Sequence, residues 1–109
     1  MATTYKTLGQ AAPAATTSTD LYTVPAATSA ILSTITVTNR AATDATFRIS
    51  TSLAGAVLAN KDYLVYDATV PGSGFITLTL GITMATTDKL RVYASSANIS
   101  FNVFGTELS

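Results

Sequence analysis

The longest β-patterned run in this chain of 109 residues is Ser29-Ala30-Ile31-Leu32-Ser33-Thr34-Ile35-Thr36-Val37-Thr38-Asn39. Isoleucine, valine and threonine follow a period of two along it, the pattern of a β-strand with one buried face. Strict alternation places Ile31, Ile35 and Val37 on the buried face. Threonine suits a half-wet sheet surface, so the other face should look toward solvent or a partner.

Further strands are expected on both sides of this run. The strongest turn signal is Pro71-Gly72-Ser73-Gly74, and polar stretches at 39–44 and 96–98 read as other connections. The expected strands are 4–10, 21–24, 29–39, 45–51, 63–70, 75–80, 89–95 and 99–108. About eight short strands with turn signals roughly every 8 to 12 residues predict an all-β fold. We expect a single antiparallel β-sandwich domain over residues 1–109, jelly-roll or immunoglobulin-like.

Alternation within these strands predicts the core. The residues expected in it are Ile31, Ile35, Val37, Phe47, Ile49, Ile76, Leu78, Leu90, Val92, Phe101 and Val103. Leu80 should also point inward, in line with Ile76 and Leu78. In the strand at 63–70, Leu64, Tyr66, Ala68 and Val70 should share one face.

Charge is scarce in this sequence. Only 11% of residues are charged, and six acids balance six bases. Binding nucleic acid or an anionic membrane needs a basic surplus, so neither is an expected partner. A surface of threonine, serine and alanine is better suited to burial in an assembly than to exposure in a free monomer.

The residue types also argue against catalysis. The chain has no cysteine, histidine or tryptophan, which removes disulfides, thiolate chemistry and the usual general base. Asp62, Asp67 and Asp88 lack the spacing of metal ligands, and we expect structural roles for them, with Asp67 paired to Arg48 or Arg91. No enzyme activity, cofactor or metal is expected. The first residues lack the apolar core of a signal peptide, and no run is long enough to span a membrane, so a cytosolic product is expected.

Residues 1–19 leave two interpretations open, an edge strand or an extended arm. After Met1, the only large apolar side chains in the segment are Tyr5 and Leu8, and residues 11–19 are small. Such a segment buries little area to offset its ordering entropy. We therefore expect an arm in which Tyr5 and Leu8 contact another chain.

Aromatic residues on the faces assigned outward mark a candidate interface. With the two arm residues, the interface set is Tyr5, Leu8, Tyr63, Phe75, Tyr93 and Phe104. The longest connection, 52–62, ends in Asn60, Asp62 and Tyr63, the only cluster that suits carbohydrate binding.

Several motifs occur in an order that is similar to a known group of proteins. They are Leu21-Tyr22-Thr23-Val24-Pro25-Ala26, Thr38-Asn39-Arg40, Tyr63-Leu64-Val65-Tyr66-Asp67, Leu78-Thr79-Leu80-Gly81-Ile82, Asp88-Lys89-Leu90-Arg91-Val92-Tyr93-Ala94 and Phe104-Gly105-Thr106-Glu107. In this order, over nearly the whole chain, the sequence resembles small β-sandwich virion structural proteins of tailed bacteriophages. Each motif alone is common, and the resemblance carries no catalytic residues.

The resemblance implies a non-enzymatic capsid cement or decoration subunit, made in the host cytoplasm and incorporated into the virion. It implies the major capsid protein as partner and a homo-oligomer, with a trimer expected because such proteins commonly occupy three-fold positions. A tail, neck, baseplate or fibre component is the first alternative. A carbohydrate-binding adhesin module is the second.

Overall fold

The computed structural model describes residues 2–109. Its strands are β1 (Thr3–Ala11), β2 (Thr19–Thr23), β3 (Ser29–Asn39), β4 (Ala45–Ser52), β5 (Tyr63–Val70), β6 (Phe75–Leu78), β7 (Ile82–Met84), β8 (Lys89–Ala94) and β9 (Ile99–Leu108). Two short 3₁₀ turns, η1 (Leu53–Gly55) and η2 (Asn60–Asp62), fill the longest connection. β7 was not among the strands expected from the sequence.

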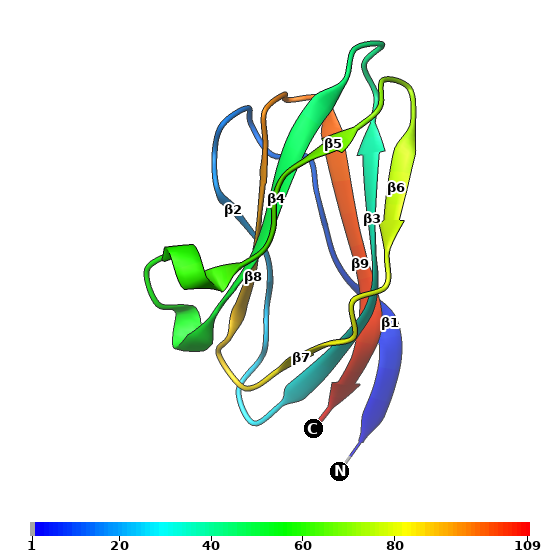
Figure 1. Cartoon of the computed structure of the whole chain (residues 1–109). Helices are drawn as coiled ribbons and strands as arrows, with labels where there is room; N and C mark the ends of the chain where they lie inside the picture. Colours follow the sequence, from blue (N-terminus) through cyan, green and yellow to red (C-terminus); the bar gives the residue numbers. More distant parts are fainter. Residues whose placement is uncertain (1) are drawn as a thin grey trace.

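Two antiparallel sheets pack face to face (Figure 1). Sheet A has the order β1-β9-β3-β6, with β7 also paired to β3, and sheet B has the order β2-β8-β4-β5. If β6 and β7 count as one interrupted strand, the first strand pairs with the last, the second with the next to last, and so on inward. This is the strand order of a jelly roll. The predicted all-β sandwich is confirmed, and the strand order selects the jelly roll from the two types expected.

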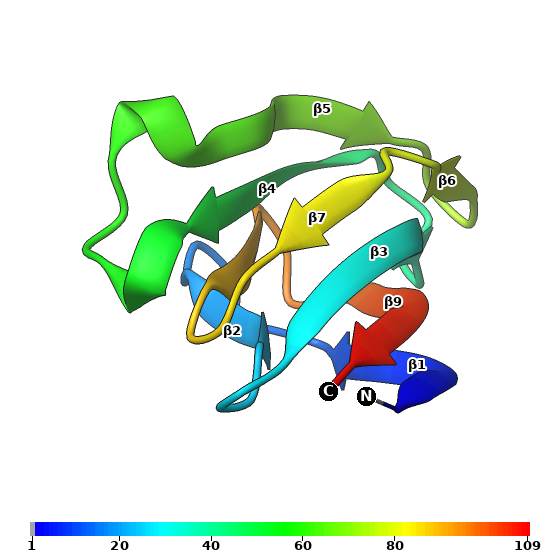
Figure 2. The same cartoon turned by 90° about the horizontal axis from the view of Figure 1, so that it is seen from below.

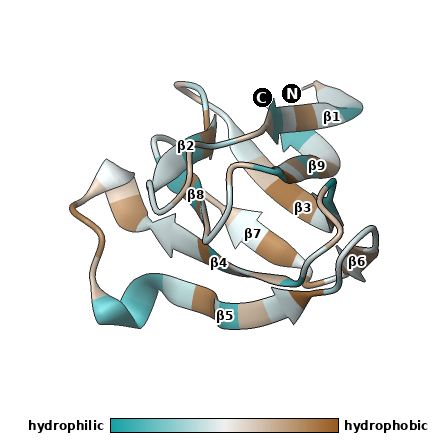
Figure 3. Cartoon of the chain, turned by 90° about the horizontal axis from the view of Figure 1, so that it is seen from above, coloured by the Kyte–Doolittle hydropathy of each residue, from teal (hydrophilic) through white to brown (hydrophobic). Residues whose placement is uncertain are grey.

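The core lies between the sheets. Most predicted core residues are buried there, namely Ile35, Val37, Phe47, Ile49, Leu90, Val92, Phe101 and Val103. Phe47 of sheet B meets Phe101 of sheet A edge to face, with ring centroids 6.2 Å apart. Hydrophobic and polar positions alternate along the strands, as Figure 3 shows, because each sheet has one buried face.

The prediction for Ile31 is wrong, because β3 contains a β-bulge. Its register against β9 shifts between Leu32 and Thr34, so an extra residue, Ser33, interrupts the period of two. Ala30 and Leu32 are buried before the bulge, and Ile31 is exposed. A bulge reverses which side chains face the core, so alternation counted back from Ile35 fails here.

Gly105 of β9 makes room for this bulge. A Cβ atom at Gly105 would lie 2.2 Å from the carbonyl oxygen of Ile31 and 3.0 Å from the Cα of Leu32. Both contacts are to backbone, which cannot move aside as a flexible side chain can. Glycine is therefore required where the two strands approach this closely.

A second bulge corrects the faces expected for β5. Its register against β4 shifts near Asp67, whose φ of 53° is left-handed. Val65 packs against the core before the bulge, and Ala68 and Val70 turn inward after it. Tyr66 therefore points outward rather than sharing the buried face of Val70.

The sheet edge at β6 is less buried than expected. Ile76 and Leu78 are only partly buried, although both pack against the core. Leu80 lies beyond the end of β6 and is exposed. Edge strands have no neighbour on one side, so their side chains are covered less completely.

The N-terminal segment forms β1, an edge strand of sheet A in the same domain. The prediction of an arm that is ordered only by another chain is therefore wrong. Residues 3–11 pair with β9 along most of their length, and Leu8 packs against the core. Although the segment buries little apolar area, its backbone hydrogen bonds to β9 keep it ordered. Whether Tyr5 also contacts another chain stays a prediction.

A partly buried carboxylate, that of Glu107, connects the two sheets near the chain ends. Glu107 accepts a hydrogen bond from the Tyr22 hydroxyl at 2.5 Å and pairs with Lys6 Nζ at 2.9 Å. The hydrogen bonds from Lys6 and Tyr22 lower the pKa of Glu107 below its usual value, and Lys6 has the larger effect. Nearby, Ala2 and Ser109 exchange two backbone hydrogen bonds, so the ends lie side by side (Figure 1).

The bulge in β3 predicts opposite outcomes for two isoleucines of one strand. Ile35→Ala should lower the free energy of unfolding by about 2–5 kcal/mol, because its side chain is fully buried. Ile31→Ala should cost less than about 1 kcal/mol, because its side chain lies at the surface. Urea unfolding of both variants measures the difference. Equal losses would contradict the bulge.

The contacts of Glu107 predict an acid-dependent stability. Its folded pKa lies below the unfolded value of about 4.3, so its contribution is complete above that pH and is lost as pH falls through the folded pKa. The free energy of unfolding should decrease from about pH 5 to pH 3. Glu107→Gln should be less stable at pH 7 and show a shallower pH dependence in urea titrations. An equally steep dependence would assign the effect to other carboxylates, such as Asp20 and Asp67.

Candidate interaction faces

Cross-strand register places one set of side chains on the outer face of sheet A. Counted by alternation from the buried residues, the set is Tyr5, Thr7, Gln10, Ile31, Thr34, Thr36, Thr38, Phe75, Thr77, Thr83, Ser100, Asn102, Phe104 and Thr106. None of these residues carries a formal charge. We call this surface the uncharged face.

Large apolar side chains are spread over the uncharged face. Tyr5 is 80% exposed, Phe75 68%, Ile31 43% and Phe104 37%. With strands about 4.8 Å apart and a rise of about 3.3 Å per residue, four strands from Ile31 to Thr38 cover roughly 450 Å². The face is thus uncharged throughout, with four exposed large apolar side chains among hydroxyl and amide side chains. This combination makes it a candidate interaction surface.

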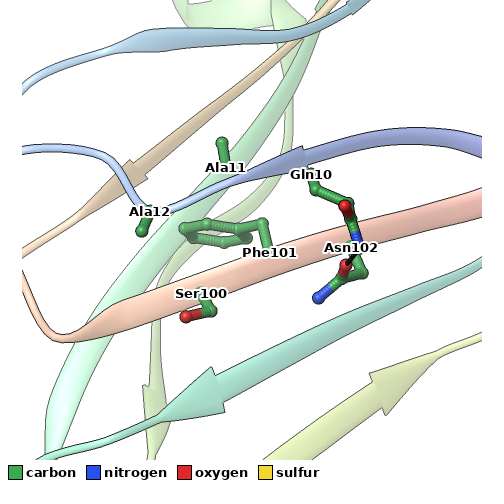
Figure 4. Close-up of a pocket in the computed structure, with 6 residues that line it drawn as sticks. All are labelled: Gln10, Ala11, Ala12, Ser100, Phe101 and Asn102. Carbon is green, nitrogen blue, oxygen red and sulfur yellow. Dashed lines mark hydrogen bonds between the residues drawn. The ribbon is translucent and has the colours of Figure 1, made fainter.

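A shallow depression of about 400 Å³ lies at one end of the uncharged face (Figure 4). Its lining is Gln10, Ala11, Ala12, Ser100, Phe101 and Asn102. The Gln10 amide nitrogen donates to Asn102 Oδ1 at 2.7 Å across β1 and β9.

The outer face of sheet B is centred on Arg48. Its guanidinium lies over the rings of Tyr66 and Tyr93, at 4.2 and 4.3 Å from their centroids. Its Nε donates to Asp67 Oδ1 at 2.7 Å, and this hydrogen bond lowers the pKa of Asp67. Tyr63 meets Tyr66 edge to face at 4.9 Å. These five residues form the arginine cluster.

A second charged group lies on the same face as the arginine cluster. Asp20 accepts from Lys89 Nζ at 2.9 Å and from Arg91 Nε at 3.0 Å, and the Lys89 bond is the main cause of its lowered pKa. Arg91 also donates to Ser52 Oγ at 3.0 Å and to the carbonyl of Ala56 at 2.8 Å. The two outer faces therefore differ, with paired charges on sheet B and none on the uncharged face.

Five of the six residues expected at an interface lie on one of these two faces. Tyr5, Phe75 and Phe104 belong to the uncharged face, and Tyr63 and Tyr93 belong to the arginine cluster on the other side. The sixth residue, Leu8, packs against the core, so its expected place at an interface is not seen. The expected set is therefore two separate groups rather than one patch.

The expected pairing of Asp67 with Arg48 or Arg91 is confirmed for Arg48. Sequence reasoning missed Ile31 on the uncharged face and the stacking of Arg48 on Tyr66 and Tyr93. The signal for the arginine cluster was Asp67, since an aspartate within a strand suits the left-handed backbone of a bulge. It also missed the exposed Leu53 and Val57, which project from the connection around η1.

The acids weighed for chemistry are engaged in the fold. Asp88 accepts from the backbone N–H groups of Ala54 and Ala85, each at 2.9 Å. Asp62 is buried and accepts from the Ala59 N–H at 3.0 Å, which lowers its pKa. Among residues 2–109, no group of three or more acidic, histidine or cysteine side chains is arranged to hold a metal ion.

Comparison of the chain with family models, curated proteins and solved structures found no match. Within the part that the structure describes, no helix is both long and apolar enough to cross a membrane. What the two faces do is therefore inferred from their own chemistry.

The stacking of Arg48 predicts energetic coupling on one face only. Arg48→Ala and Tyr66→Ala should together destabilise the protein less than the sum of the single variants, because each removes the same contact. Arg48→Ala combined with Phe75→Ala, on the opposite face, should be additive within error. Urea unfolding of both double-variant cycles provides the measurement. Additivity in the first cycle would mean that the stacking adds no stability.

Proposed function

We propose that this chain is a non-enzymatic structural protein of a phage virion, a cement or decoration subunit that bridges neighbouring capsid proteins. The observation that carries the proposal is the uncharged face, with Tyr5, Ile31, Phe75 and Phe104 exposed on it. A protein that works free in solution usually avoids such a face, whereas burial against a partner gives it a role.

The size of the uncharged face fits a repeated contact. Roughly 450 Å² is smaller than the roughly 800 Å² per partner of a standard interface. One such contact alone would be weak. On a shell, each subunit meets more than one neighbour, and linked contacts bind far more tightly than either alone.

Two further points support the proposal. The jelly-roll strand order recurs in viral capsid domains, which is a likeness at the level of fold only. The sequence motifs from 21–26 to 104–107 resemble virion proteins of tailed phages. The same fold also serves lectins, so the strand order by itself does not choose between shell and glycan binding.

The tail, neck, baseplate or fibre role uses the same face and differs only in the partner. The adhesin alternative has less support, because the Asp62 carboxylate is buried and bonded to its own backbone. A glycan-binding carboxylate needs to be accessible to sugar hydroxyls.

The test is whether the chain occurs in virions and where. Mass spectrometry of purified virions should find it at a fixed ratio to the major capsid protein, and in the head fraction after heads and tails are separated. Presence in tails only would favour the alternative. Absence from virions, or binding to host glycans by the free protein, would overturn the proposal.

The face is tested with a matched pair of charge insertions. Thr36→Lys puts a charge at the centre of the uncharged face, and Thr69→Lys puts one on the exposed outer side of sheet B. In rebinding to virions stripped of the protein, Thr36→Lys should lose at least about tenfold in affinity, or about 1.4 kcal/mol, and Thr69→Lys should bind normally. Equal binding by both would exclude this face.

A further inference from the structure

The N-terminal half of β1 is an open strand edge. Sheet A ends at β1, which pairs with β9 on one side only (Figure 2). Residues 3–7 are all exposed, and the register against β9 runs through them without a shift, from Thr3 opposite Leu108 to Thr7 opposite Phe104. Farther along, Gly9 lies close to the backbone of Leu21 in β2, on the inner side of sheet A.

The free backbone groups on this edge can be assigned. Ala2 and Ser109 exchange two hydrogen bonds, so they form a hydrogen-bonded pair of the antiparallel ladder. Such pairs alternate with non-hydrogen-bonded ones, which makes Thr3, Tyr5 and Thr7 the residues whose N–H and C=O point away from β9. No other backbone partner of these three is found among residues 2–109.

The other sheet edges are less suited to pairing. β2 is short, contains Asp20 and has a register shift, and β5 is bent by the bulge at Asp67. The edge formed by β6 and β7 is interrupted around Gly81. Short strands, charges and bulges are the usual protection of edges, and residues 3–7 lack them except for Lys6, which is paired with Glu107.

We infer that this edge pairs with the same edge of a second copy of the chain, antiparallel and across a two-fold axis at Tyr5. Tyr5 then faces Tyr5 of the second copy, and Thr3 faces Thr7 of the second copy. Each of the three outward-pointing residues then forms a hydrogen-bonded pair with a residue of the second copy. Three pairs with two backbone hydrogen bonds each give six hydrogen bonds. The match is self-complementary, as a two-fold interface requires.

Side chains and charge agree with this register. The two Tyr5 rings become cross-strand neighbours on the uncharged face, a favourable aromatic pair. Lys6 faces Thr4 of the second copy rather than another Lys6, so like charges do not meet. The two uncharged faces join into one surface of roughly 900 Å², which exceeds the roughly 800 Å² per partner of a standard interface.

The inference goes beyond the proposed function and does not depend on it, because it concerns two copies in solution. It also differs from the expected trimer. One strand edge that meets itself across a two-fold axis closes a dimer and leaves no equivalent edge for a third chain.

Cross-linking tests the axis directly, because the native chain has no cysteine. In a hydrogen-bonded pair the two Cα atoms lie about 5.5 Å apart, so Tyr5→Cys should link into dimers with a short bifunctional maleimide. Phe75→Cys is the control, because the two β6 strands lie roughly 30 Å apart in such a dimer. Equal linking of both variants would overturn the inference.

Sedimentation tests the backbone pairing. The parent protein should form dimers at high micromolar concentration. Tyr5→Pro removes an outward N–H and no hydrogen bond to β9, so it should leave the melting temperature within about 3 °C but weaken the dimer at least about tenfold. Tyr5→Ala keeps the N–H and should weaken it less. Monomers or trimers of the parent, or unchanged dimerisation of folded Tyr5→Pro, would overturn the inference.

Discussion

β9 approaches β3 closely at Gly105, and the part of the sandwich near the two chain ends depends on this approach. Because no Cβ stands between the strands, β3 takes in the extra residue Ser33. The bulge turns Leu32 inward to the core and turns Ile31 outward. One missing side chain thus decides which residues before Ser33 are buried and places Ile31 on the uncharged face.

The sequence patterns predicted the strands and most of the core, because period-two alternation is local and holds wherever the ladder is regular. Ile35, Phe47 and Phe101 are buried as expected. The errors arise where pairing partners decide the geometry. Bulges at Ser33 and Asp67 change which face a side chain occupies, and they depend on register against strands far away in the sequence. The place of β1 was undecided for the same reason, since its partner β9 lies at the other end of the chain.

The candidate interface was predicted as a set of residue types but not as a place. Phe75 and Tyr93 were expected at one interface, yet they lie on opposite outer faces because their strands belong to different sheets. Jelly-roll pairing also sorts the charges. Arg48 and Asp20 lie on sheet B with their partners, and the outer face of sheet A keeps only neutral side chains. The few charged residues of the chain are therefore unevenly distributed over the surface.

The hydrogen-bonded ends of the chain have a consequence for how the molecule can be rebuilt. Ala2 and Ser109 are neighbours in one ladder, so a linker of a few residues joins them without disturbing either sheet. New ends can then be opened at an exposed turn such as 71–74, giving a circular permutant with the same strand pairs. Peptides fused to the two original ends would emerge at the same end of the sandwich. Two labels attached there would therefore lie close enough together for the distance between them to be measured.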